Sequence, residues 1–129
     1  MVFLPLLVFQ LLFGFVLSAS YNFDISWVNA APDGVTRPVI GVNGKWPPPI
    51  IKAEVGEEIT VVVHNNLGNE TTSIHWHGIH QAHGKRGIMD GPTAVSQCPI
   101  PPGSTFTYSF IVDLPGTYWY RESRLHMMN

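Results

Sequence analysis

The chain has 129 residues with a formal net charge of −2, and 12% of its residues are charged. This balance gives no basic face for nucleic acid and no acidic tail, so nucleic-acid binding is not expected. The hydrophobic fraction of 45% is enough for the core of one domain. The 12 glycines and 11 prolines follow no period, which favours a turn-rich β domain over collagen or disorder.

The first twenty residues, "MVFLPLLVFQLLFGFVLSAS", carry no charge and end in small side chains. This pattern predicts a secretory signal over residues 1–20, although Lys and Arg are missing from its start. The alternative is a retained membrane anchor, since the apolar run approaches the ~20 residues of a spanning helix. A cleaved signal leaves residues 21–129 as one secreted, extracellular domain. The sequon "NET" predicts N-glycosylation at Asn69, in agreement with export.

Short β segments separated by turns follow the leader. Alternating or apolar runs predict strands in "YNFDISWV", "RPVIGV", "TTSIHWHGI", "STFTYSFIV" and "PGTYWYR". Asn43-Gly44 predicts a hairpin turn, and the prolines of "KWPPPII" predict an edge or connector. "KAEVGEEITVVVHNN" is expected to form two strand pieces hinged near Gly56. About seven such segments with no helical period predict a single antiparallel β sandwich or barrel.

The stretch "SIHWHGIHQAH" holds the candidate metal ligands. On a strand His75 and His77 point to the same face, and imidazole suits copper, zinc, iron or nickel. Two ligands fall short of a closed shell, so the pair alone is also typical of solvated histidines. His80 has the opposite parity and, with His83, is expected in a loop. His64 is expected at the surface where a strand ends.

Several motifs in order resemble one known family. "RPVIGVNGKWPPPII", "GEEITVVVHNNL", "HWHGIHQ", "MDGPTAVSQCPIPPGSTFTYSF" and "PGTYWY" are similar to the first domain of the multicopper oxidases. That family includes fungal laccases, ascorbate oxidases and iron-transport ferroxidases, and the resemblance spans roughly Asn29 to Tyr120. It implies an all-β, cupredoxin-like Greek-key sandwich or barrel with copper as the cofactor.

The resemblance also implies site roles. His75 would bind the type-two copper and His77 one copper of the type-three pair. These coppers reduce dioxygen to water with electrons from a type-one copper, which oxidises a phenolic substrate or ferrous iron. Asp90 in "MDGP" matches a residue that assists proton delivery, and a reaction that consumes protons needs such a group nearby. Asp before Gly is equally an ordinary turn residue.

Cys98 is the single cysteine. A small blue-copper site with His126 and Met127 or Met128 is disfavoured, because those sites gather their ligands from one short loop. In many laccases the cysteine of "QCPI" is disulfide-bonded to a later domain, so the resemblance implies a partner outside this sequence.

The pattern departs from the family after "GTYWY". The family continues with a second His-x-His, whereas Arg121 and Ser123 stand at those places and "RESRLHMMN" forms a divergent tail over residues 121–129. A guanidinium stays protonated and does not ligate copper. We therefore expect a fragment, a retained intron or a genuine short product. The type-one site is missing too, so oxidase activity is not expected from this chain alone.

Two other functions stay open. One is a stand-alone secreted copper-binding or structural β domain, and another is an inert secreted β domain without a copper preference. For the leading hypothesis, the partners are copper ions and the missing cupredoxin domains. Dioxygen and a phenolic or ferrous substrate act only in the full-length enzyme.

Overall fold

The computed structural model describes residues 18–81 and 89–123. Residues 1–17 of the predicted signal lie outside this range, as do His83, His126, Met127 and Met128. Within it the secondary structure is almost entirely β. The strands are β1 (Ser18–Ala30), β2 (Arg37–Val42), β3 (Glu58–Asn65), β4 (Ile74–His77), β5 (Thr105–Ile111) and β6 (Trp119–Glu122). The predicted all-β class is confirmed, and the described residues include no helix long and apolar enough to span a membrane.

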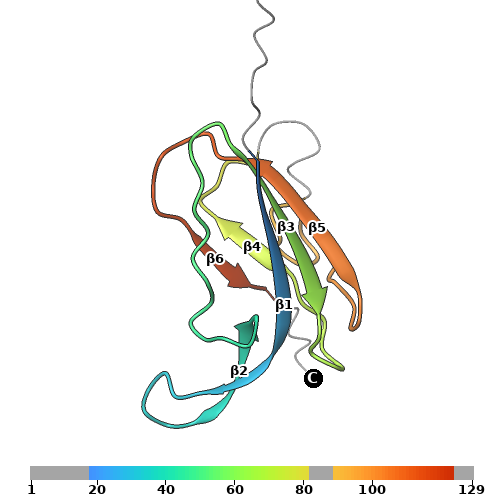
Figure 1. The fold of residues 1–129 in the computed structure, drawn as a ribbon. Coiled ribbons are helices and arrows are strands. Elements are labelled where there is room, and N and C mark those ends of the chain that lie inside the picture. Colours follow the sequence, from blue (N-terminus) through green and yellow to red (C-terminus); the bar gives the residue numbers. More distant parts are fainter. Residues whose placement is uncertain (1–17, 82–88, 124–129) are drawn as a thin grey trace, which may run out of the picture.

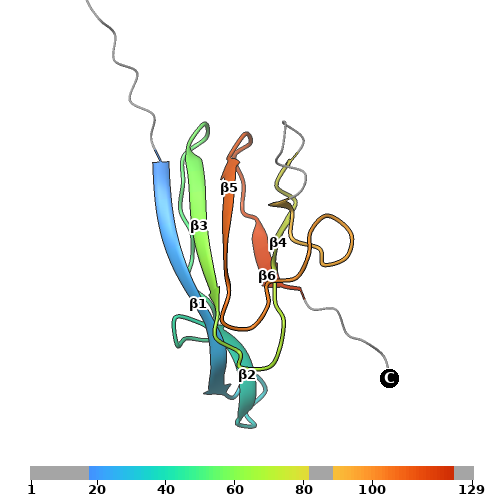
Figure 2. The same ribbon diagram turned by 90° about the vertical axis from the view of Figure 1, so that its right-hand side faces the viewer.

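The strands form two layers. A four-stranded sheet has the order β2-β1-β3-β5, and β4 and β6 form a two-stranded sheet on one side of it (Figures 1 and 2). All ladders are antiparallel except β1–β3, which is parallel with Phe23 opposite Val63. The predicted antiparallel type holds for the other three ladders, and antiparallel pairing is wrong at this one. A parallel pair needs a long crossover, and β2 with the connection up to residue 57 supplies it.

The connection before β3 differs from the prediction in one place and agrees in another. "KAEV" forms no strand, because Glu54 and Glu57 close a turn: Glu57 N donates to Glu54 O over 3.0 Å and Glu54 N to Glu57 Oε2 over 2.8 Å. The hairpin turn at Asn43-Gly44 is confirmed, since both residues have positive φ (54° and 70°), as a type I′ turn requires.

The core lies between the two sheets. Alternate residues of β3 and β5, including Val61, Val63 and Phe110, are buried against the β4–β6 layer. Trp76 of β4 is the central side chain, with ring centroids 4.8 Å from Phe110 and 5.7 Å from Tyr120. Burying a large apolar side chain stabilises a fold by about 1.5–3 kcal/mol, so this aromatic contact is a major part of what holds β4 in place.

Buried polar groups join the loops to the core. The Tyr108 hydroxyl accepts hydrogen bonds from Ile74 N (2.9 Å) and Gln97 Nε2 (3.0 Å). Asn65 Nδ2 donates to the carbonyls of Glu70 (2.8 Å) and Ile100 (2.9 Å). Because unpaired buried polar groups are costly, these bonds hold the chain leading into β4 against β3 and β5.

The backbone of a turn at residues 89–93 packs directly against β4. Gly91 has φ +100°, and a Cβ built there would lie 1.9 Å from the carbonyl oxygen of Ile74. The buried Ser73 hydroxyl donates to Gly91 O over 2.6 Å. Only glycine allows this approach, so the turn backbone can hydrogen-bond to the strand beside it.

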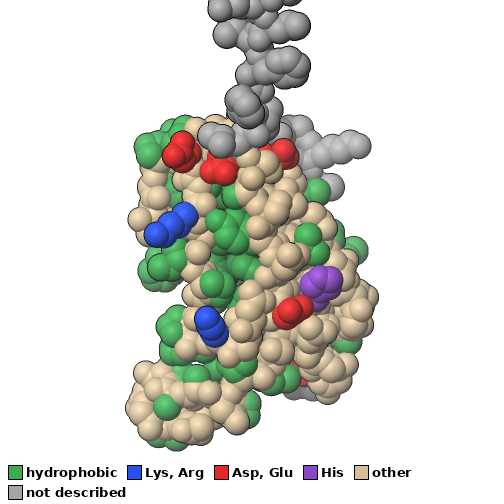
Figure 3. Space-filling view, viewed as in Figure 1, with side chains coloured by type: hydrophobic (Ala, Val, Ile, Leu, Met, Phe, Trp, Pro, Cys, Tyr) green, Lys and Arg blue, Asp and Glu red, His purple; other side chains and the backbone are tan. Residues whose placement is uncertain are grey.

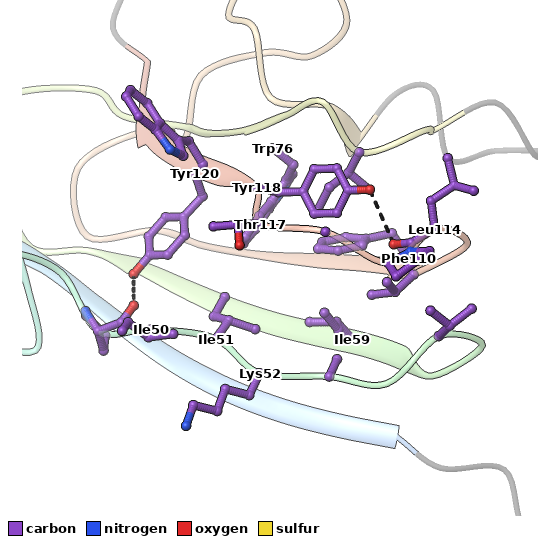
Figure 4. Close-up of a pocket in the computed structure, with 18 of the residues that line it drawn as sticks. Ile50, Ile51, Lys52, Ile59, Trp76, Phe110, Leu114, Thr117, Tyr118 and Tyr120 are labelled. Atoms are coloured by element: carbon purple, nitrogen blue, oxygen red, sulfur yellow. Dashed lines mark hydrogen bonds between the residues drawn. The ribbon is translucent and has the colours of Figure 1, made fainter.

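An apolar groove of about 710 Å³ opens along one side, between the layers (Figure 4). Hydrophobic side chains gather on the face shown in Figure 3. The groove is lined mainly by two segments, Pro47–Ala53 and Leu114–Tyr120, with Ile59, Trp76 and Phe110 at its floor. The Tyr120 hydroxyl donates to Pro49 O across it, and burial raises the pKa of Tyr120 to about 12.

Replacing Gly91 with alanine should destabilise the fold severely. The added Cβ cannot occupy the space of the Ile74 carbonyl, so either the turn or β4 must move, at a cost of about 3 kcal/mol or more. Gly103→Ala is the matched control, since Gly103 has φ +71° with open space around its missing Cβ. It should cost only about 1–2 kcal/mol. Urea unfolding measures both, and equal losses would refute the close-contact argument.

Alkaline pH should weaken the fold through its tyrosines. Burial raises the pKa of Tyr120 from 10 to about 12 and also raises the pKa of Tyr108, so folding favours their neutral forms. This stabilisation is complete below the unfolded value of 10 and is lost as pH rises through about 12. The unfolding free energy should therefore fall across this window. Tyr120→Phe should flatten part of the decline, and an unchanged slope in that variant would contradict the assignment.

Candidate metal centre

β4 places its two histidines on the outer face of the sandwich, with His77 exposed and His75 partly buried. Trp76 points into the core, so His75 and His77 share the opposite face, as their spacing predicts. In the antiparallel ladder with β6, His75 lies opposite Arg121 and His77 opposite Trp119. The outer face of this two-stranded sheet therefore carries two imidazoles, a guanidinium and an exposed indole.

The two imidazoles meet edge to face. His75 Nε2 lies 3.3 Å from His77 Nδ1, and the ring centroids are 5.4 Å apart at an interplanar angle of 80°. At that distance one nitrogen carries the hydrogen and the other accepts it. A metal ion bound by both atoms would take the place of this shared proton.

The Asp90 backbone sets the tautomer of His75. His75 Nδ1 lies 2.8 Å from the carbonyl oxygen of Asp90, which only accepts, so this nitrogen carries the proton. Nε2 then carries no proton and accepts from His77 Nδ1, so its lone pair points to the place where a metal ion would lie, as is common in metal-binding histidines. Trp76 N donates to the same carbonyl over 3.2 Å. The Asp90 carboxylate Oδ1 is 3.5 Å from His75 Nδ1.

A buried hydroxyl pair supports the site from behind. Ser73 Oγ lies 2.9 Å from Thr93 Oγ1, and both hydroxyls contact the carbonyl of Ser123, at 2.9 Å and 3.2 Å respectively. Together they join the residues before β4, the 89–93 turn and the end of β6. Sequence reasoning missed Ser73 and Thr93, whose only signal was their position next to the "HWH" and "MDGP" motifs.

A polar hollow of about 320 Å³ lies beside His75, lined also by Pro92, Arg121, Glu122 and Ser123. The two positions where the family pattern expects histidine, 121 and 123, thus reach the same hollow as His75. Their actual side chains supply no imidazole. Among the described residues, 18–81 and 89–123, no group of three or more His, Cys, Asp or Glu side chains is placed to hold a metal ion.

Two imidazoles, one of them in a tautomer set by the Asp90 carbonyl, fit copper as a partial ligand set. Imidazole nitrogen is a normal copper ligand, and the lone pair of His75 Nε2 is directed at the neighbouring ring rather than into the core. Two donors leave further coordination positions open. The described residues therefore form part of a metal site and not a closed one.

Other predicted residues lie away from this pair. His80 is 62% exposed, with Nδ1 3.4 Å from Asp113 Oδ2. His64 is the penultimate residue of β3, and its Nδ1 lies 2.7 Å from Thr105 Oγ1. Asn69 is exposed in the loop after β3, and Cys98 is an exposed free thiol. His83 and His126 lie outside the described residues.

Comparison with known proteins identifies the family. The model of a multicopper oxidase domain matches residues 24–128. The chain is 54% identical over 103 residues to iron transport multicopper oxidase FET3 of Gibberella zeae, covering 79% of this chain and 16% of that protein. It is 42% identical over 129 residues to L-ascorbate oxidase of Cucumis sativus, covering 92% of this chain and 21% of that protein.

Solved structures agree in fold. The laccase from Botrytis aclada superposes with a TM-score of 0.76 at 42% identity, covering 82% of this chain and 19% of that one. Fet3p, a multicopper oxidase that functions in iron import, superposes with a TM-score of 0.75 at 39% identity over 81% of this chain and 20% of that chain. The expected cupredoxin-like fold is confirmed. The chain spans about a sixth of the length of the first curated relatives. With its matched residues 24–128, the chain belongs to the multicopper oxidase family, whose members bind copper.

Proposed function

We propose that this chain is the copper-binding N-terminal domain of a secreted, laccase-like multicopper oxidase. In the whole enzyme His75 would bind the type-two copper and His77 one copper of the type-three pair, whereas this chain alone would hold one ion between the two imidazoles. The observation that carries the proposal is the bond of His75 Nδ1 to the Asp90 carbonyl, because it leaves Nε2 as a metal ligand beside a second imidazole. The whole enzyme would couple one-electron oxidation of a phenolic or ferrous substrate to reduction of dioxygen.

The residues of this chain orient ligands and hold a proton. Bound copper supplies the one-electron redox chemistry. The Asp90 carbonyl keeps His75 in one tautomer, and Gly91 and Ser73 keep that carbonyl against β4. The Asp90 carboxylate is partly exposed and close to the His75 ring, so it can take a proton from solvent and hold it at Oδ1 near the site.

Further polypeptide would complete the site. The two histidines leave coordination positions open, and the exposed apolar residues Trp119, Leu114 and Ile50 suit packing against other domains. We propose other cupredoxin domains as these partners. Cys98, exposed and unpaired here, would form its disulfide with a segment of those domains. Oxidase turnover would need them, because residues 18–81 and 89–123 contain no group of three His, Cys, Asp or Glu side chains placed to hold a metal ion.

Export is the second part of the proposal. Residues 1–20 would be the signal and residues 21–129 the cupredoxin domain, with residues 121–129 as a divergent tail. β1 begins at Ser18, so cleavage near Ser20 would remove three residues that pair with Glu58–Thr60. The register from Tyr21 to Ile25 would remain, and so would the buried Phe23.

A stand-alone copper-binding or structural β domain is the alternative. Such a domain would bind copper with His75, His77 and the Asp90 carbonyl that orients His75, all of which this chain supplies. Copper retention after dialysis separates the two: tight equimolar binding supports the stand-alone module, and loose binding supports part of a larger site.

His75→Ala should weaken copper binding at least tenfold. The substitution removes the donor whose tautomer the fold presets, and two imidazoles bind a metal much better than one. Competitive titration with a chromophoric chelator gives the dissociation constants of the parent and the variant. His64→Ala is the control, since His64 contacts Thr105 at the end of β3, away from this pair. Equal copper affinities in all three proteins would refute the assigned site.

Asn69 should carry an N-linked glycan when the chain is expressed through a secretory pathway. Asn69 is exposed in a loop and lies in the sequon "NET". Asn69→Gln should abolish the shift in gel mobility that endoglycosidase treatment causes. Asn66→Gln, an exposed asparagine in the same loop without a sequon, should keep it. A parent chain that shows no shift would contradict both the export and the glycosylation proposals.

A further inference from the structure

A permanent positive charge lies beside the proposed copper ligands. Arg121 is opposite His75 in the β4–β6 ladder, and both side chains line the polar hollow of about 320 Å³. Directly opposed residues of an antiparallel pair have Cβ atoms about 4.5–5.5 Å apart. Guanidinium does not deprotonate in proteins, so this charge is present at every relevant pH.

The other charges near the hollow are the carboxylates of Asp90 and Glu122, which partly offset the positive charge of Arg121. The Asp90 carboxylate lies 3.5 Å from His75 Nδ1, on the side of the ring that faces the 89–93 turn. Glu122 lines the hollow, but its Oε1 accepts from the Thr72 hydroxyl over 3.3 Å. Arg121 is the cation among the residues lining this hollow.

Repulsion between Arg121 and a bound metal ion scales with the charge of the ion. At a given position, the repulsive free energy between Arg121 and a divalent ion is twice that for a monovalent ion, whatever the effective dielectric constant. The small number of donors also favours the monovalent ion. Cu(II) prefers tetragonal sites with about four nitrogen or oxygen donors, whereas Cu(I) is stable with two or three ligands.

We propose that Arg121 shifts the copper preference of the His75–His77 pair from the divalent toward the monovalent ion. The inference rests on the proposed copper binding and adds the oxidation state that this chain holds by itself. The residue at position 121 then determines ion specificity. It contributes no metal ligand, but its charge lies opposite His75 in the β4–β6 ladder.

Arg121→Gln in the full 129-residue chain tests the proposal. For a charge about 7 Å from the ion at an effective dielectric constant of about 40–80, Cu(I) should bind roughly three- to sevenfold more tightly in the variant. Cu(II) should gain the square of that factor, roughly ten- to fiftyfold. Affinities are measured with chromophoric chelators, anaerobically for Cu(I), and the readout is the ratio of the two affinities.

Three further variants separate charge from other causes. Arg121→Lys retains the charge and should keep the parent ratio. Lys52→Gln makes the same change in net charge at a residue on the other side of the groove from Trp76 of β4 (Figure 4), and should leave the ratio unchanged. Asp90→Asn removes a negative charge near His75 and should shift the ratio in the opposite direction, weakening Cu(II) more than Cu(I).

The outcomes distinguish this inference from the proposed function. Equal gains for both ions, or no change on Arg121→Gln, overturn the charge selection while copper binding stands. If neither ion binds the parent chain and His75→Ala alters nothing, the copper site and its selectivity fail together. A gain for Cu(II) that is the square of the gain for Cu(I), lost again in Arg121→Lys, supports the proposal.

Discussion

The burial of Trp76 is the contact on which the rest of the site depends. Its ring fills the space between the two sheets, against Phe110 and Tyr120, and so fixes which face of β4 points inward. Because side chains alternate along a strand, His75 and His77 must then lie outside. A slip of one residue would bury both imidazoles and expose the indole, which the core could not tolerate. The metal-facing surface is therefore a consequence of the hydrophobic core on the other side of the same strand.

Alternation alone would leave the histidines free to rotate. The turn at residues 89–93 removes that freedom for His75, since the Asp90 carbonyl accepts from its Nδ1. This contact is possible because Gly91 lets the turn backbone lie against Ile74, where any side chain would collide. Ser73 then ties the turn to the end of β6 through Gly91 O and Ser123 O. The orientation of one ring thus depends on backbone packing several residues away, which is the usual role of groups behind a metal ligand.

Local patterns were sufficient for much of this structure. The alternation around Phe23, Val61 and Tyr108 predicted β1, β3 and β5, and the parity of His75 and His77 predicted their shared face. The parallel pairing of β1 with β3 could not be read in the same way, because it depends on how a long connection returns the chain. "KAEV" was misassigned since a local Glu54–Glu57 turn competes with strand formation there. Ser73 and Thr93 were missed because their importance comes from contacts 18–50 residues away, which no short window contains.

The register between β4 and β6 also decides what kind of surface the histidines occupy. With His75 opposite Arg121 and His77 opposite Trp119, the neighbours across the ladder are a fixed cation and a large exposed apolar ring. The cation opposes the accumulation of positive charge at the imidazoles, while the indole and the nearby groove favour contact with more protein. Neither neighbour supplies a metal ligand. The fold of this chain accordingly presents two imidazole donors on an open face, one of them oriented by the Asp90 carbonyl. The charges and ligands that surround them on that face determine which ion they hold.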